Sequence, residues 1–80
     1  MKSKGRPDNT DRYVGQKIKE IRQAKNLTQT DVALAAGTTF QQIQKYENGI
    51  NRVSAGILFK IANHFDTPIA NFFPPQKVKN

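Results

Sequence analysis

Residues 27–49, LTQTDVALAAGTTFQQIQKYENG, carry the start and stop signals of two short helices. Thr28 stands just before a run of small and apolar residues, and Asp31 follows it at the spacing of a capping box. Gly37 can adopt the left-handed conformation that ends a helix at little cost. The sequence therefore predicts a helix over Gln29–Ala36.

The same signals recur directly after this glycine. Thr39 and Gln42 repeat the cap spacing, and Gly49 supplies the next helix stop. A second helix is therefore predicted over Phe40–Asn48. Two short helices joined by a tight turn that contains glycine form a helix-turn-helix.

A longer amphipathic helix is predicted before this motif. Polar positions separate apolar residues that recur at spacings of four and three, namely Val14, Ile18 and Ile21. We expect this helix to begin near Asp11 and to run to about Lys25. Residues 1–10 offer too little apolar surface to offset the entropy of ordering them, so they are predicted to be a flexible basic arm.

Two further helices are predicted after the motif. Ser54 is a candidate cap for a helix whose apolar face consists of Ile57, Leu58, Ile61, Ala62 and Phe65. Pro68 suits the first position of a last short helix, which Pro74 and Pro75 would stop. With residues 76–80 expected to be disordered, the prediction is an all-α, five-helix domain over residues 11–75 without a sheet.

Length and composition exclude several classes of protein. A chain of 80 residues supports one core, and the absence of cysteine excludes disulfides and thiolate metal clusters. No apolar run approaches the ~20 residues that cross a bilayer, and the first ten residues lack the apolar centre of a signal peptide. We expect a soluble, cytoplasmic protein with no membrane contact.

An enzymatic function is not expected. His64 is the only histidine, it has no cysteine or clustered carboxylates to act with, and it is interpreted as a surface residue near a helix end. Neither HxxxH nor CxxC spacing occurs, so we expect no metal and no cofactor.

The charge balance favours a polyanionic partner. Thirteen Lys and Arg residues against six Asp and Glu residues give a net charge of +7. Five of the basic residues lie in the two polar ends of the chain, namely Lys2, Lys4, Arg6, Lys77 and Lys79. Charged ends either keep a protein in solution or contact phosphate, and the charge count alone leaves both interpretations open.

From Ile18 to Phe73, about seven tenths of the chain, the order of these signals resembles the lambda-repressor-like (XRE, Cro-type) helix-turn-helix family. The resemblance is most specific from Leu27 through Ala33 to Gly37, and from Thr38 to the segment Tyr46-Glu47-Asn48-Gly49. It implies a sequence-specific transcriptional regulator of double-stranded DNA, with repression as the expected role. The resemblance further implies a bacterial or phage protein that is associated with the nucleoid. It also implies that the helix Phe40–Asn48 lies in the major groove.

The resemblance places one set of side chains over the base edges: Phe40, Gln41, Gln42, Gln44 and Lys45. Glutamine can bond adenine through N6 and N7, and lysine can donate to guanine O6 and N7. Phe40 either lies against a thymine methyl group or covers the helix pair as a small apolar lid, and both interpretations stay open.

A second set is expected to contact phosphates: Gln29, Thr39, Asn48, Asn51 and Arg52. Gln29 begins a helix, where free backbone N–H groups and the positive end of the helix dipole favour an anion. In the family, residues at the positions of Arg22 and Glu47 form a partly buried ion pair, so the same structural pair is expected here.

A homodimer is the expected assembly, since one small module covers only one half-site of a palindromic operator. Its candidate interface is the carboxy-terminal helix region, with Ile69, Phe72 and Phe73. The competing interpretation places Ile69 and Phe72 in the core and leaves open whether Phe73 belongs to the core or to the interface. An alternative function is an antitoxin or small adaptor of the same fold whose main role is to bind a partner protein.

Overall fold

The computed structural model describes residues 7–76, and within that range the chain is all-α. Its elements are α1 (Asn9–Ala24), α2 (Gln29–Ala36), α3 (Phe40–Glu47), α4 (Ala55–His64) and the 3₁₀ helix η1 (Ile69–Phe72). The predicted fold class is confirmed, with α2 placed as expected. No helix in the described range is both long and apolar enough to cross a membrane.

The fifth predicted helix is a short 3₁₀ helix rather than an α-helix. Its backbone bonds join residues three apart, from the Asn71 N–H to the Pro68 carbonyl and from the Phe73 N–H to the Ala70 carbonyl. Because Pro74 and Pro75 follow after one further residue and have no N–H to donate, the four residues cannot extend into α-helical turns.

Helix α1 begins two residues earlier than the prediction from Asp11. Asp8 is its N-cap, and Asp8 and Asp11 exchange side-chain bonds with each other's backbone N–H at 3.0 and 2.9 Å. Residues 8–10 of the predicted flexible arm therefore cap or belong to the helix. Residues 1–6 of that arm and 77–80 of the predicted tail lie outside the described residues.

Within residues 7–76, each of the four α-helices is followed by a residue in the left-handed region, namely Asn26, Gly37, Gly49 and Asp66. At each end the next N–H bonds back to the carbonyl five residues earlier, as from Leu27 to Arg22 and from Ile50 to Lys45. This pairing satisfies carbonyl groups that a helix end leaves free, and it turns the chain sharply. The sharp turns allow short helices to pack around one centre.

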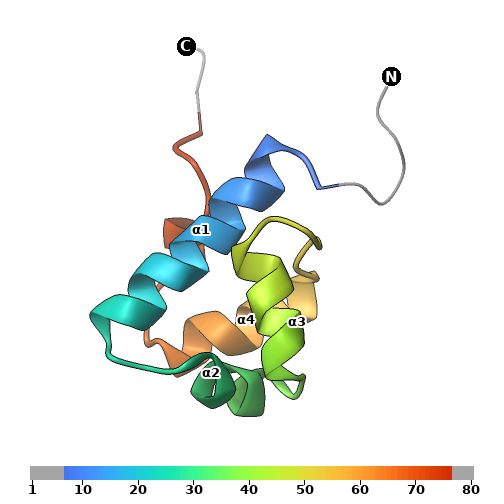
Figure 1. Ribbon diagram of the computed structural model, residues 1–80. Helices are drawn as coiled ribbons and strands as arrows, with labels where there is room; N and C mark the ends of the chain where they lie inside the picture. Colours follow the sequence, from blue (N-terminus) through green and yellow to red (C-terminus); the bar gives the residue numbers. More distant parts are fainter. Residues whose placement is uncertain (1–6, 77–80) are drawn as a thin grey trace.

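The core lies where the helices meet. Helix α1 packs on α3 and η1, while α2 packs on α3 and α4. Figure 1 shows α1 running past α3, with α2 below and α4 behind. The buried apolar side chains are Val14, Ile18, Val32, Ala33, Ala36, Ile43, Tyr46, Leu58, Ile61, Ala62, Phe65 and Phe72. The core therefore fixes α3 by one face and leaves its other face to solvent.

The carboxy-terminal apolar residues divide differently from the prediction. Phe72 is fully buried, with its ring stacked on Phe65 at a centroid separation of 6.1 Å, so it cannot belong to a dimer interface. Ile69 and Phe73 are each 41% exposed, so the interpretation of Ile69 as a core residue is wrong. Residues three apart lie on the same side of a 3₁₀ helix, so the helical period alone does not distinguish Ile69 from Phe72.

The capping box of α2 predicts a pH dependence of stability. Its Thr28 N–H donates to the Asp31 carboxylate at 2.9 Å, and this bond, with a smaller contribution from the Thr28 side chain, lowers the pKa of Asp31 below 3.8. A depressed folded-state pKa gives stability that is present above pH 3.8 and is lost as the pH falls through the folded-state pKa. Denaturant unfolding should therefore find Asp31→Asn less stable than wild type at neutral pH, and the difference should shrink in acid. A difference that stays constant with pH would contradict this role for the charge.

Candidate nucleic-acid interface

Helix α3 has two chemically different faces. Ile43, Tyr46 and Glu47 are buried against α1 and α2, and Thr39 caps the helix by accepting the Gln42 N–H at 3.1 Å. The opposite face carries Gln41, Gln44 and Lys45, all exposed. The helix is therefore anchored from behind and presents polar side chains in front.

The structure brings together most of the side chains predicted to contact bases. Four are exposed and lie at spacings of three and four on one side of α3, namely Phe40, Gln41, Gln44 and Lys45. Gln42 is partly buried and lies to the side of this group. The Phe40 ring is 47% exposed and stands outside the core cluster. The outer face of α3 thus offers amide, ammonium and aromatic groups with no packing partner in the core.

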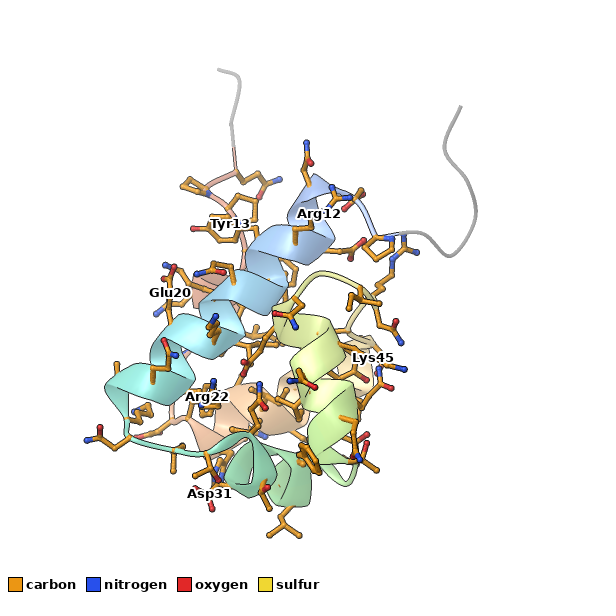
Figure 2. The ribbon with its side chains drawn as sticks, viewed as in Figure 1. Arg12, Tyr13, Glu20, Arg22, Asp31 and Lys45 are labelled. Atoms are coloured by element: carbon orange, nitrogen blue, oxygen red, sulfur yellow. The ribbon has the colours of Figure 1, made fainter. Side chains whose placement is uncertain are left out.

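A hydrogen-bonded network fixes the end of α3 to α1 and α2. The Glu47 carboxylate is 1% exposed and accepts from Arg22 Nε at 2.6 Å and Arg22 Nη2 at 3.0 Å. Arg22 Nη1 also donates to the Leu27 carbonyl at 2.9 Å, which ties down the connection between α1 and α2. Figure 2 labels Arg22, which extends from α1 toward the space between α1, α2 and α3. The expected pair is thus a fork-shaped contact that joins three helices.

The Gln29 side chain, which is predicted to contact a phosphate, bonds within the protein in this structure. Its Nε2 donates to Glu47 Oε1 at 3.0 Å, so the amide is a third donor in the ion-pair network. The physical reason is that the buried carboxylate has lone pairs left after Arg22 has donated, and Gln29 lies within reach at the start of α2. The first backbone N–H groups of α2 remain without a partner in the helix itself.

The other residues predicted to contact phosphate occupy different environments. Asn48 is exposed just after α3, and Asn51 is partly buried in the following loop. Arg52 is half exposed, and its Nε donates to Asp11 Oδ2 at 3.0 Å, an ion pair that the sequence analysis missed. Thr39 is exposed, and its hydroxyl still has a proton to donate after accepting the Gln42 N–H.

Gly15 is a positioning residue that the sequence analysis also missed. It is buried within α1 where that helix crosses the end of α3, and an added Cβ would overlap the Tyr46 carbonyl oxygen and lie 3.0 Å from its carbon. A glycine inside an amphipathic helix costs about 1 kcal/mol of stability relative to alanine. Its presence inside the predicted helix indicates a packing reason and could have identified Gly15 from the sequence. The contact between the two backbones sets how close α3 lies to α1.

Comparison with known families places the motif in a wider group. The helix-turn-helix family profile matches residues 18–72. An uncharacterized HTH-type transcriptional regulator of Sinorhizobium fredii is 44% identical over 68 residues, which are 85% of this chain and 48% of that protein. The chain thus spans about half the length of the curated relatives it matches.

Solved structures show the same helical arrangement. The restriction-modification controller protein C.AhdI from Aeromonas hydrophila has a TM-score of 0.73 and 29% identity, and the match covers 78% of this chain and 94% of that one. Hydroxypropylphosphonic acid epoxidase from S. wedmorenis has a TM-score of 0.75 over 82% of this chain and 35% of its own. At 22% identity, this second likeness concerns the fold alone.

Proposed function

Because this chain belongs to the helix-turn-helix family of transcriptional regulators, we propose that it binds double-stranded DNA sequence-specifically and represses transcription. The observation that carries the proposal is the divided surface of α3, with one face in the core and an exposed face of Gln41, Gln44 and Lys45. A helix of this kind fits the major groove, where each base pair presents its own pattern of donors and acceptors.

The exposed face of α3 supplies the groups that distinguish base pairs. Gln41 can accept from adenine N6 and donate to N7, and Gln44 offers a second amide one turn later. Lys45 can donate to guanine O6 and N7, while the half-exposed Phe40 ring fits the methyl group of thymine. Together they would specify a short sequence in each half-site.

Phosphate contacts on both sides of α3 would hold the helix in register. We assign one side to the free backbone N–H groups at the start of α2 with the Thr39 hydroxyl, and the other to Asn48, Asn51 and Arg52. The Gln29 side chain would act indirectly, because its bond to Glu47 holds the start of α2 beside the end of α3. These contacts would position the protein without choosing a sequence.

We further propose that the domain acts as a two-fold dimer on a palindromic operator in the cytoplasm, at the nucleoid. Two exposed apolar residues at the carboxy-terminal segment support this assembly, Ile69 and Phe73. Phe73 also lines an open groove together with Tyr13 and Pro74. Bound protein would occlude the DNA it covers, which is the simplest route to repression.

Gln41→Ala is the variant that tests base recognition. Affinities should be measured for a duplex selected by the wild-type protein and for all single-base-pair changes in it. We expect the variant to lose about 1–3 kcal/mol of discrimination at one position of each half-site, because its bidentate bond to a base is gone. Asn63→Ala removes an exposed amide from α4, behind α3, and should leave the profile unchanged. Equal weakening on all sequences by Gln41→Ala would refute the assignment of α3.

A further inference from the structure

An open groove lies between the first turns of α1 and the turn that follows α3. It has a volume of about 450 Å³, and its polar lining comes from Asn9, Arg12, Tyr13, Gln16 and Asn48. Four of these belong to α1, which the proposed DNA contacts do not include. Figure 2 shows Arg12 at the start of α1, above the end of α3, and Lys45 on α3 itself.

One positive charge lies in the groove lining, that of Arg12. Arg12 Nη1 donates to Asn9 Oδ1 at 3.2 Å, and the other N–H groups of the guanidinium can donate to a ligand. Asn48 adds an amide from the wall opposite α1, whereas the Gln16 amide donates to Glu20 Oε2 at 3.4 Å. A guanidinium with an amide on the opposite wall is a donor set that can bind phosphate oxygens.

The carboxylates near the groove are already paired. Glu47 lines it, but its carboxylate is 1% exposed and accepts from Arg22 and Gln29 on the other side. Asp11, in the first turn of α1, accepts from the Asp8 N–H and from Arg52. Among the described residues that line the groove, Arg12 thus carries the charge that a ligand meets.

Gly49 shapes the floor beneath Arg12. Its φ of 71° is left-handed, and an added Cβ would lie 3.0 Å from Arg12 Cγ. The missing side chain therefore lets the Arg12 stem lie close against the turn after α3. This contact couples the position of the guanidinium to the end of the helix that we propose reads the DNA.

We infer that this groove binds a phosphate of the DNA backbone, with Arg12 as its charged contact. The inference rests on the proposed function. Asn48 lies in this groove and also belongs to the proposed set of phosphate contacts after α3. The groove therefore adjoins the sugar-phosphate chain on that side of α3. Because phosphates are the same at every base pair, the contact adds affinity without sequence preference.

Arg12→Gln, Arg12→Lys and the control Lys17→Gln test the inference. Lys17 also lies on α1 but pairs with Glu20 and lines a different groove, beside Phe73. The probe is a fluorescently labelled random-sequence duplex, and its binding to the full chain is measured by anisotropy between ~50 and ~200 mM salt. Thermal unfolding of each variant checks that the fold is retained.

Arg12→Gln should lower the slope of log K against log salt by ~0.9 and weaken binding about eightfold near 0.1 M, as one lost phosphate contact requires. Arg12→Lys should keep the wild-type slope, and Lys17→Gln should change it less than Arg12→Gln does. An unchanged slope for Arg12→Gln, or an equal loss for Lys17→Gln, overturns the groove assignment while the proposed function stands. A wild-type protein that binds no duplex at all overturns both.

Discussion

Replacing Glu47 with alanine is expected to lower the free energy of unfolding by about 3 kcal/mol or more, because it leaves a buried charge without its partner. Arg22 is only 12% exposed and would keep the Leu27 carbonyl as its remaining acceptor. Gln29 would lose its acceptor as well. Chemical denaturation of the variant and the wild type measures the difference directly.

The loss of stability in Glu47→Ala depends more on the unpaired charge of Arg22 than on the strength of the ion pair itself. A double variant, Arg22→Met with Glu47→Leu, removes both charges and should recover most of the lost stability, since apolar replacements of buried pairs are often neutral. If Glu47→Ala costs less than about 1 kcal/mol, the pair behaves like a surface ion pair and does not hold the three helices together.

Gly15→Ala is expected to destabilise the domain by about 2 kcal/mol, although alanine favours helix formation. The new methyl group would collide with the Tyr46 carbonyl, which is backbone and cannot rotate away. Helix α1 and the end of α3 would therefore have to separate. Thermal and denaturant unfolding measure the loss, and DNA affinity should fall with it because the separation moves α3.

The matched control is Gly56→Ala in α4. An added Cβ at Gly56 meets nothing within 4 Å, so only the helix preference of alanine acts there. We expect Gly56→Ala to raise stability by about 0.5–1 kcal/mol. Similar effects at both glycines would show that the contact between α1 and α3 is not the reason for glycine at position 15.

The helix-turn-helix could be predicted from the sequence because its signals are local. Thr28 with Asp31 gives a reciprocal cap in the structure, and Gly37 and Gly49 have the left-handed geometry that ends α2 and α3. Local capping and turn chemistry act within a few residues, so they can be recognised from spacing alone. The fold class followed from these elements.

Contacts between distant segments were harder to predict. The bond from Gln29 to Glu47 and the ion pair from Arg52 to Asp11 join residues 18 and 41 positions apart. No local spacing encodes either of them, and a surface glutamine or arginine has many acceptors within reach. The prediction that Ile69 and Phe72 share the core was wrong for Ile69 for a related reason, because a single 3₁₀ turn gives no reliable apolar period.

The ion-pair network has a consequence for recognition as well as for stability. Arg22, Glu47 and Gln29 connect the end of α3 to α1 and to the start of α2. A reading helix needs a fixed angle to its phosphate contacts, because small displacements cost hydrogen bonds to base edges. The network thus joins the proposed base-contacting element to the proposed phosphate-contacting elements.

Selection of binding sites from a random duplex pool at ~150 mM salt tests the central claim most directly, because non-specific attraction to phosphate is much reduced there. The account predicts recovery of a palindromic motif whose half-sites lie about one helical turn apart. The bases that face α3 should be adenine, guanine or thymine, the last through its methyl group. Recovery of duplexes without a shared motif would contradict sequence-specific recognition by the exposed face of α3.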